Sequence, residues 1–243
     1  MFPDRATLFA APYCDAPLYD ESMAKVGFWG CNNFYGVDLT ALRDDAHSFY
    51  FSQPVVGPVS PHTLLATECG YPFDFGSMSA EALRNFTMPL SFSFNAVTPI
   101  HGICLWFDTS FPGGTKEIVL STSPCEPLTH WYQVRCMLKA PLAVGPGHKV
   151  TGSLRFEANE SRGYNIHMSL TNVNSEVTST NVIVTQCALH HFQYSTQASA
   201  QAYYPQQQQQ QQQPMQWQAT QATTDDTGAQ ATANGGVDGT AHV

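Results

Sequence analysis

The sequence is short of charge and has no basic cluster. Charged side chains make up 12% of the 243 residues, about half the average for soluble domains, and the formal net charge is −9. All ten Lys and Arg fall between Arg5 and Arg162, without forming a basic stripe. Because nucleic-acid sites neutralise phosphates with clustered Lys and Arg, we expect no direct binding of nucleic acid. An acidic surface suits a basic protein substrate, although this indication is weak by itself.

Disulfide and metal-binding patterns are also missing. The seven cysteines are odd in number, widely spread and never spaced C-x-x-C: Cys14, Cys31, Cys69, Cys104, Cys125, Cys136 and Cys187. This pattern excludes a disulfide framework and a cysteine zinc site, and it indicates reduced, mostly buried intracellular thiols. A cupin-type metal protein using His101, His130 and His148 is a poor alternative, because no His-x-His spacing occurs. His190 and His191 would point to opposite faces of a strand.

No stretch approaches the roughly 18 consecutive apolar residues that a membrane span needs. Asp4 and Arg5 interrupt any apolar run at the N-terminus, so the sequence shows no signal peptide. We therefore expect a soluble, intracellular protein without membrane partners.

Short strands dominate from about residue 48 to residue 195. Residues 90–94, Leu-Ser-Phe-Ser-Phe, alternate apolar and polar side chains, as a half-buried strand requires. Further strands are predicted at residues 103–107, 118–120, 150–156, 165–170 and 182–184, separated by turns rich in Pro, Gly, Asn and Ser. Many short strands with regular turns predict a mainly β, antiparallel barrel or jelly-roll-like domain.

Residues 15–50 interrupt the strand pattern with helical signals. Asp15 is a candidate N-cap for a helix whose apolar residues include Tyr19, and Asp38 is a candidate cap for a second helix that extends to about residue 47. The aromatic-rich segment between them, which contains Phe28 and Trp29, follows neither period. Such side chains need a surface to bury against, and the residues alone leave open whether this is a partner subunit or the chain's own barrel.

The C-terminal region, residues 196–243, contains no Lys or Arg and includes eight consecutive glutamines, Gln206–Gln213. It cannot bury enough apolar area to offset the entropy of ordering, so we expect a disordered tail. Weak self-association through the polyglutamine is the less favoured interpretation.

Four segments taken together resemble the protein arginine methyltransferases, and most closely their coactivator-associated, type I branch. The segments are residues 34–43 (FYGVDLTALR), 50–56 (YFSQPVV), 101–108 (HGICLWFD) and 120–133 (LSTSPCEPLTHWYQ). The resemblance extends over roughly residues 1–195. It implies a first barrel strand at residues 1–14, a helical dimerisation arm at 15–47 that includes Tyr19, Phe28 and Trp29, and a β-barrel substrate domain at 48–195.

The resemblance also implies a site at the tripeptide Thr129-His130-Trp131. Arginine methylation needs the guanidinium held planar and a proton removed, which a His linked to a carboxylate can assist. His130 is then the catalytic candidate, while Thr129 and Trp131 are the substrate-binding candidates, with Trp131 offering a π face to the cation. Trp106 is interpreted as a core residue and Glu126 as a solvated turn residue rather than a catalytic acid.

The family's cofactor, S-adenosylmethionine, has no recognisable site in this sequence. It lacks a G-x-G-x-x-G or related glycine-rich motif, an acidic pair followed by a helix, and a two-glutamate hairpin. We expect no cofactor or metal to be bound by this chain alone, and two hypotheses follow. The chain is the substrate and dimerisation half of a histone-methylating enzyme, or it is a non-catalytic module that dimerises with a full-length enzyme. Histone substrates and a nuclear and cytoplasmic location are implied by the resemblance only.

Overall fold

The computed structural model describes residues 2–113, 115–185 and 193–194. The chain divides into two units, Met1–Tyr204 and Pro205–Val243, and every described residue belongs to the first. The tail expected at residues 196–243 therefore lies outside the described residues.

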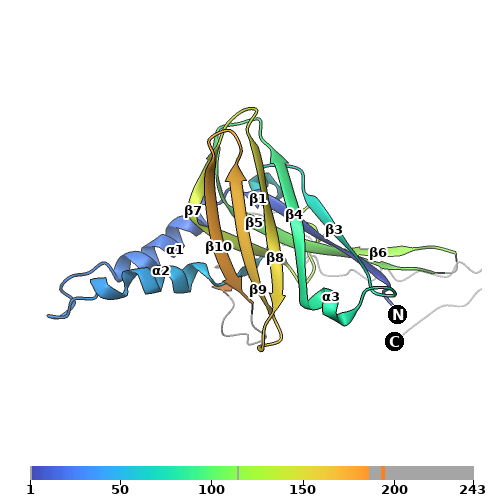
Figure 1. The fold of residues 1–243 in the computed structure, drawn as a ribbon, viewed down its shortest axis with the longest axis horizontal. Helices are drawn as coiled ribbons and strands as arrows, with labels where there is room; N and C mark the ends of the chain where they lie inside the picture. Colours follow the sequence, from blue (N-terminus) through green and yellow to red (C-terminus); the bar gives the residue numbers. More distant parts are fainter. Residues whose placement is uncertain (1, 114, 186–192, 195–243) are drawn as a thin grey trace, which may run out of the picture. The chain divides into compact units, whose positions relative to one another are not determined.

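Two antiparallel sheets form the described part of the chain (Figure 1). The larger sheet has the strand order β11-β2-β7-β5-β1-β3, with β6 paired to β5. Its strands are β1 (Arg5–Tyr13), β2 (Val55–Gly57), β3 (Cys69–Asp74), β5 (Thr98–Phe111), β6 (Ile118–Ser121), β7 (Gln133–Val144) and β11 (Gln193–Tyr194). Its ladders are antiparallel except for that of β11 with β2. The mainly β, antiparallel fold class is thus confirmed.

The smaller sheet has the order β10-β9-β8-β4. Its strands are β4 (Asn85–Ser93), β8 (Lys149–Ala158), β9 (Tyr164–Asn172) and β10 (Val177–Val184). Leu90 and Phe92 are buried while Ser91 and Ser93 are exposed, as the alternation of the sequence predicts. The helical elements are α1 (Ala16–Phe28), α2 (Arg43–Phe51), α3 (Ala80–Arg84) and the short 3-10 turns η1 (Thr40–Leu42) and η2 (Pro61–Thr63).

The main core fills the space between the two sheets, with members such as Leu138 from the large sheet and Leu154 and Leu170 from the small one. A second cluster, including Phe51, Trp106 and Met137, lies on the other face of the large sheet under α1 and α2. Strands β5 and β7 are therefore covered on both faces along their central parts. This explains why neither strand shows an alternating sequence there.

A bulge in β5 decides which residues face each core. The pairing of β5 with β7 shifts between Ile100 and Gly102, so Ile100 and Ile103 both face the main core although they are three residues apart. A Cβ atom on Gly102 would lie 2.1 Å from the carbonyl oxygen of Cys136, so only glycine fits this close approach. The bulge leaves His101 beside helix α1.

Side chains close the two seams where the sheets meet without a backbone ladder. At one seam the Nδ2 of Asn181 on β10 donates to the carbonyls of Phe51 and Met137, each at 2.7 Å, and Ser179 donates to the carbonyl of Ala140 at 2.6 Å. At the other seam the Sγ of Cys69 on β3 lies 3.5 Å from both backbone polar atoms of Ser91 on β4. Polar side chains, buried at the first seam and partly exposed at the second, thus hold the sheets together where strands do not pair.

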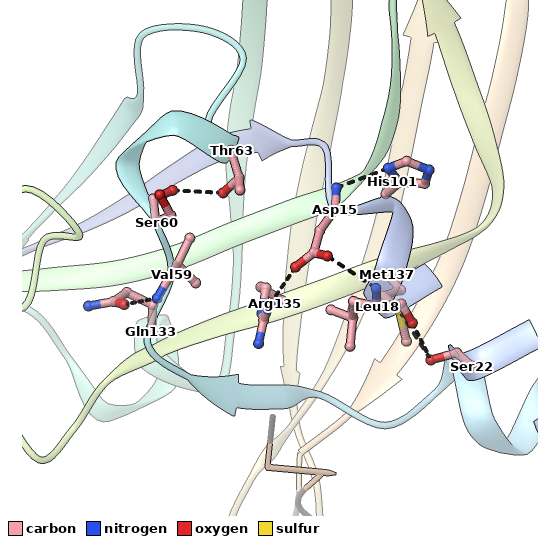
Figure 2. Close-up of polar contacts among 10 residues, drawn as sticks. All are labelled: Asp15, Leu18, Ser22, Val59, Ser60, Thr63, His101, Gln133, Arg135 and Met137. Atoms are coloured by element: carbon pink, nitrogen blue, oxygen red, sulfur yellow. Dashed lines mark hydrogen bonds and ion pairs between the residues drawn. The ribbon is translucent and has the colours of Figure 1, made fainter. Parts of the chain in front are cut away.

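The chain leaves the sheet at Asp15, between β1 and α1. The Oδ1 atom of Asp15 accepts the backbone N–H of Leu18 at 3.1 Å, which confirms the predicted N-cap. Its Oδ2 atom accepts from Arg135 of β7 at 2.7 Å in a buried ion pair, and its backbone N–H donates to the Nδ1 of His101 at 3.1 Å. Figure 2 shows Asp15 between these two partners. One residue therefore fixes the start of α1 against two strands.

The second helix differs from its prediction. Asp38 accepts hydrogen bonds from the backbone and hydroxyl of Thr40, at 2.9 and 2.7 Å, but this turn leads only into η1. Helix α2 begins at Arg43 and continues to Phe51, four residues beyond the expected end. Residues 57–89, where we found no family motif, contain β3 and α3 as well as turns.

We predict that replacing Arg135 with methionine lowers the free energy of unfolding by about 3–5 kcal/mol, because Asp15 is left buried without its cation. Urea denaturation measures the change. Arg84→Gln is the matched control: its pair with Glu81 is exposed, so a loss below about 1 kcal/mol is expected. Equal losses in both variants would contradict a special role for the buried pair.

A pH dependence follows from His101, which is only 5% exposed. A backbone N–H always donates, so the Nδ1 of His101 must be unprotonated to accept from Asp15. Burial lowers the pKa of His101 below 6.5, against the opposing effect of Asp15 and Asp20. Below pH 6.5 His101 therefore binds a proton in the unfolded chain but not in the folded chain. The free energy of unfolding falls as pH decreases, until the pKa of His101 in the folded chain is reached.

Comparing urea denaturation at pH 7.5 and pH 5 isolates this contribution. His101→Asn, whose Oδ1 can still accept from Asp15, is expected to lose less stability over this interval than the unaltered chain. An identical pH dependence in both proteins would show that His101 does not supply it.

Candidate functional site

The segment from Thr122 to Tyr132, which contains the sequence-predicted site, is a loop between β6 and β7. Thr122, the first residue of the loop, is fixed to β5 by two hydrogen bonds. Its hydroxyl donates to the carbonyl of Phe107 at 2.8 Å and accepts from the backbone N–H of Phe107 at 3.0 Å. The Ser121 hydroxyl donates to Asp108 at 2.5 Å. The loop thus leaves the sheet from a defined position.

Gln133 fixes the other end of the loop and was not found from the sequence. Its Nε2 donates to the carbonyl of Thr122 at 2.8 Å, and its Oε1 accepts the backbone N–H of Val59 at 2.9 Å. The side chain is buried, so its amide satisfies backbone groups that would otherwise lack partners. A Gln two residues after the tripeptide gives no signal of this role, because both of its partners are backbone groups that lie elsewhere in the sequence.

The loop presents His130 and Trp131 outward. The rings of His130 and Trp131 are 3.9 Å apart at 31°, and Trp131 also meets the edge of Phe107 at 6.2 Å and 73°. Trp131 is 47% exposed in spite of these contacts, and His130 is exposed as well. The structure thus brings an imidazole and an indole together on one surface, where a cation could lie against the aromatic face.

Thr129 differs from its two neighbours. Its Oγ1 is buried and has no hydrogen-bond partner among the described residues, while its carbonyl accepts from the backbone N–H of Tyr132 at 3.3 Å. Thr129 therefore faces into the loop and contributes to its turn.

The two residues interpreted as non-catalytic are placed accordingly. Trp106 is buried in the second cluster and stacks on Phe9 at 5.8 Å. Glu126 is exposed in the turn that follows Ser123. Both interpretations agree with the structure.

Tyr19 lies on the barrel side of α1 rather than on its free surface. Its hydroxyl donates to the carbonyl of Lys139 on β7 at 2.9 Å, and its ring contacts Phe51 and His101. Tyr19 therefore holds the base of the arm against the barrel. Its expected part in dimerisation stays a prediction.

Phe28 and Trp29 lie at the far end of α1, where an aromatic cluster is exposed. Phe28 contacts Trp29 at 5.4 Å and Phe34 at 5.3 Å, and Phe34 contacts Tyr35, which is 93% exposed. Figure 1 shows α1 and α2 running side by side away from the sheets towards this end. The exposed apolar side chains within residues 15–47 are Phe28, Phe34, Tyr35, Val37 and Leu42.

Within the described ranges, no group of three or more His, Cys, Asp or Glu side chains is arranged to hold a metal ion. In the same part of the chain, no helix is both long and apolar enough to cross a membrane. The cysteines described there are unpaired, and burial raises the pKa of Cys136 to about 12, so this thiol stays protonated.

A family model described as the arginine methyltransferase oligomerization subdomain matches residues 4–180. The probable histone-arginine methyltransferase CARM1 of Oryza sativa subsp. indica is 41% identical over 170 residues, covering 70% of this chain and 32% of the relative. The histone-arginine methyltransferase CARMER of Aedes aegypti is 37% identical over 183 residues, covering 75% and 31%. The chain thus spans about a third of the length of these curated relatives.

Two solved structures share the fold. The Trypanosoma brucei PRMT1 enzyme–prozyme heterotetrameric complex with AdoHcy superposes with a TM-score of 0.61 at 23% identity, covering 75% of this chain and 56% of that one. Arabidopsis thaliana protein arginine methyltransferase 10, in an open conformation, gives 0.61 at 18% identity, covering 74% and 59%. At these identities the likeness shows the fold alone.

We predict that Gln133→Leu loosens the loop without unfolding the barrel, because two backbone groups lose their buried partner. The cost in unfolding free energy is about 1–3 kcal/mol for the unsatisfied groups. Hydrogen-exchange mass spectrometry should show faster exchange across residues 122–132 and unchanged exchange in β8 and β9. Thr151→Val, on an exposed position of β8, serves as the control. Unchanged exchange in the loop would show that Gln133 is not its anchor.

Proposed function

The chain belongs to the protein arginine methyltransferase family, and we propose that it is the substrate-binding and dimerisation half of a type I enzyme that methylates histone arginines. The match to the oligomerization subdomain over residues 4–180 carries this proposal. Relatives named histone-arginine methyltransferases support the substrate class.

In the proposed site, His130 and Trp131 line one side of the groove that receives the arginine. Trp131 offers its exposed face to the guanidinium, whose charge it attracts through the ring quadrupole. His130 accepts a proton directly, or positions the substrate, when a carboxylate of another module pairs with it. Thr129 shapes the loop, and the anchors at Thr122 and Gln133 keep both rings in place.

The described residues do not fit S-adenosylmethionine. Their ladders are antiparallel except for β11 with β2, and within these residues no strand passes through a glycine-rich turn into a helix. Cofactors of this type bind where such a turn exposes backbone N–H groups. We propose that a separate module binds the cofactor, which supplies the methyl group, and that this chain alone transfers none.

The arm gives the second part of the proposal, dimerisation. Five exposed apolar side chains between Phe28 and Leu42 on one short projection need a covering surface, and their own barrel does not provide it in this structure. A second subunit or a full-length relative is the proposed partner. The same exposed cluster favours the alternative function, a non-catalytic module that regulates a full-length enzyme by dimerising with it. A location in the nucleus and cytoplasm is proposed from the histone substrate.

Two measurements test the proposal with the full 243-residue chain. With histone H3 and radiolabelled S-adenosylmethionine, the chain alone should incorporate no methyl group, and calorimetry should detect no cofactor binding. Micromolar binding of the cofactor would overturn the assignment as the cofactor-free half.

Co-purification with a full-length relative tests the arm. We expect association that is lost when Phe28 and Trp29 are both replaced by alanine. Val97→Ala, at a more exposed apolar position on the turn between β4 and β5, should leave association intact. Absence of any association would reject dimerisation, whereas association that inhibits the relative would favour the regulatory alternative.

A further inference from the structure

A cleft of about 850 Å³ lies on the side of the small sheet that faces away from the main core. Helix α2 and strand β7 form one wall through Ser48, Phe49 and Lys139, and the outer face of β8, β9 and β10 forms the floor. The backbone N–H of Val184, at the end of β10, donates to the carbonyl of Ser52, just after α2, at 2.8 Å. This hydrogen bond joins the floor of the cleft to its α2 wall at one end. Neither residues 129–131 nor the exposed aromatic cluster at residues 28–35 contributes to it.

A row of three hydroxyl groups crosses the floor. Ser153 of β8 pairs with Ser169 of β9, and Ser169 pairs with Thr180 of β10. Directly opposed residues in antiparallel sheets place their Cβ atoms about 4.5–5.5 Å apart, so the three hydroxyls form a continuous line of donors. No hydrogen bond occupies these hydroxyls in the described structure, which leaves them free to bind an oxygen-rich group.

The cleft is basic although the protein is acidic. Lys139 and Arg155 line it together with His167, and no carboxylate belongs to its lining. Lys139 donates to the Ser48 hydroxyl at 3.1 Å, which directs its ammonium along the cleft wall. Glu157, on the same face of β8 as Arg155, pairs with Arg155 at 2.9 Å and contacts His167 at 3.2 Å, so one carboxylate lies at the edge of the cleft. Two permanent cations and the hydroxyl row therefore face one space.

Glu157 decides which anion can bind. A peptide carboxylate would only replace Glu157 on Arg155, with one negative charge exchanged for another. A phosphate monoester carries a charge of about −1.5 to −2 and three acceptor oxygens, so it can pair with Arg155 and accept from an adjacent hydroxyl, while Lys139 on the opposite wall of the cleft attracts its second negative charge. Because the Arg155–Glu157 pair is half-exposed, breaking it costs little.

We propose that this cleft binds a phosphoserine- or phosphothreonine-containing segment of a partner protein. A peptide fits better than a free ion, because the volume is in the range of about 300–1,000 Å³ that holds larger ligands. The exposed side chains of Phe49 and Val182 add apolar contacts beside the charged row. Since Phe49 and Ser48 belong to α2, the bound segment bridges α2 and the small sheet.

The experiment uses the full chain, immobilised, and three libraries of degenerate ten-residue peptides with phosphothreonine, threonine or glutamate fixed at the centre. The phosphothreonine library should be retained at least roughly tenfold more than either other library. The double variant Lys139→Gln with Arg155→Gln should abolish this difference. Arg84→Gln, which removes a more exposed but likewise paired arginine outside the cleft, should preserve it.

Glu157→Gln guards against misfolding as an explanation, because it should strengthen retention of the phosphothreonine library by removing the competing carboxylate. Equal retention of the phosphothreonine and threonine libraries would overturn the proposal, as would equal retention of the glutamate library. Full displacement by inorganic phosphate at the concentration of the peptide would show a free-anion site instead of a peptide site. Loss of retention in Arg84→Gln alone would place binding elsewhere.

Discussion

The arrangement of the described structure depends on the buried ion pair between Asp15 and Arg135. Asp15 ends β1 and caps α1, so its carboxylate must satisfy a helix N-terminus and a guanidinium at the same time. Arg135 is 4% exposed, and its Nε and Nη2 have no partner among the described residues, so the pair to Asp15 is its main compensation for burial. A small displacement of α1 would break this pair, which makes the direction of the arm a defined property of the fold.

Strand β7 connects this constraint with the candidate site. Gln133 and Arg135 are two residues apart, so they lie on the same face of the strand. Gln133 holds the loop that presents His130 and Trp131, while Arg135 holds the base of the arm. The candidate site and the projecting helices α1 and α2 thus share one rigid support. On the same strand, the backbone carbonyls of Met137 and Ala140 accept the side chains that close the barrel seam.

The parts of the fold that could be predicted are those where one face is buried and the other is solvated. Strand β4 and strand β8 alternate for this reason, and the cap at Asp15 is a local interaction that the sequence contains in full. Strand β7 was missed because both of its faces are covered and because it contains Arg135, a residue that rarely lies in a core. Asp38 was a sound local signal, but its turn ends after η1 and α2 begins independently.

The sequence by itself determined the family through four motifs, and with it the tripeptide Thr129-His130-Trp131, because these are statements about residue order. It could not determine how that loop is held, because Gln133 acts on Thr122 and Val59 through contacts that form only after β2, β6 and β7 meet. The phosphate-compatible cleft is a tertiary feature for the same reason. Its hydroxyl row comes from three strands, and its lysine comes from the opposite sheet, so no local stretch of sequence contains it.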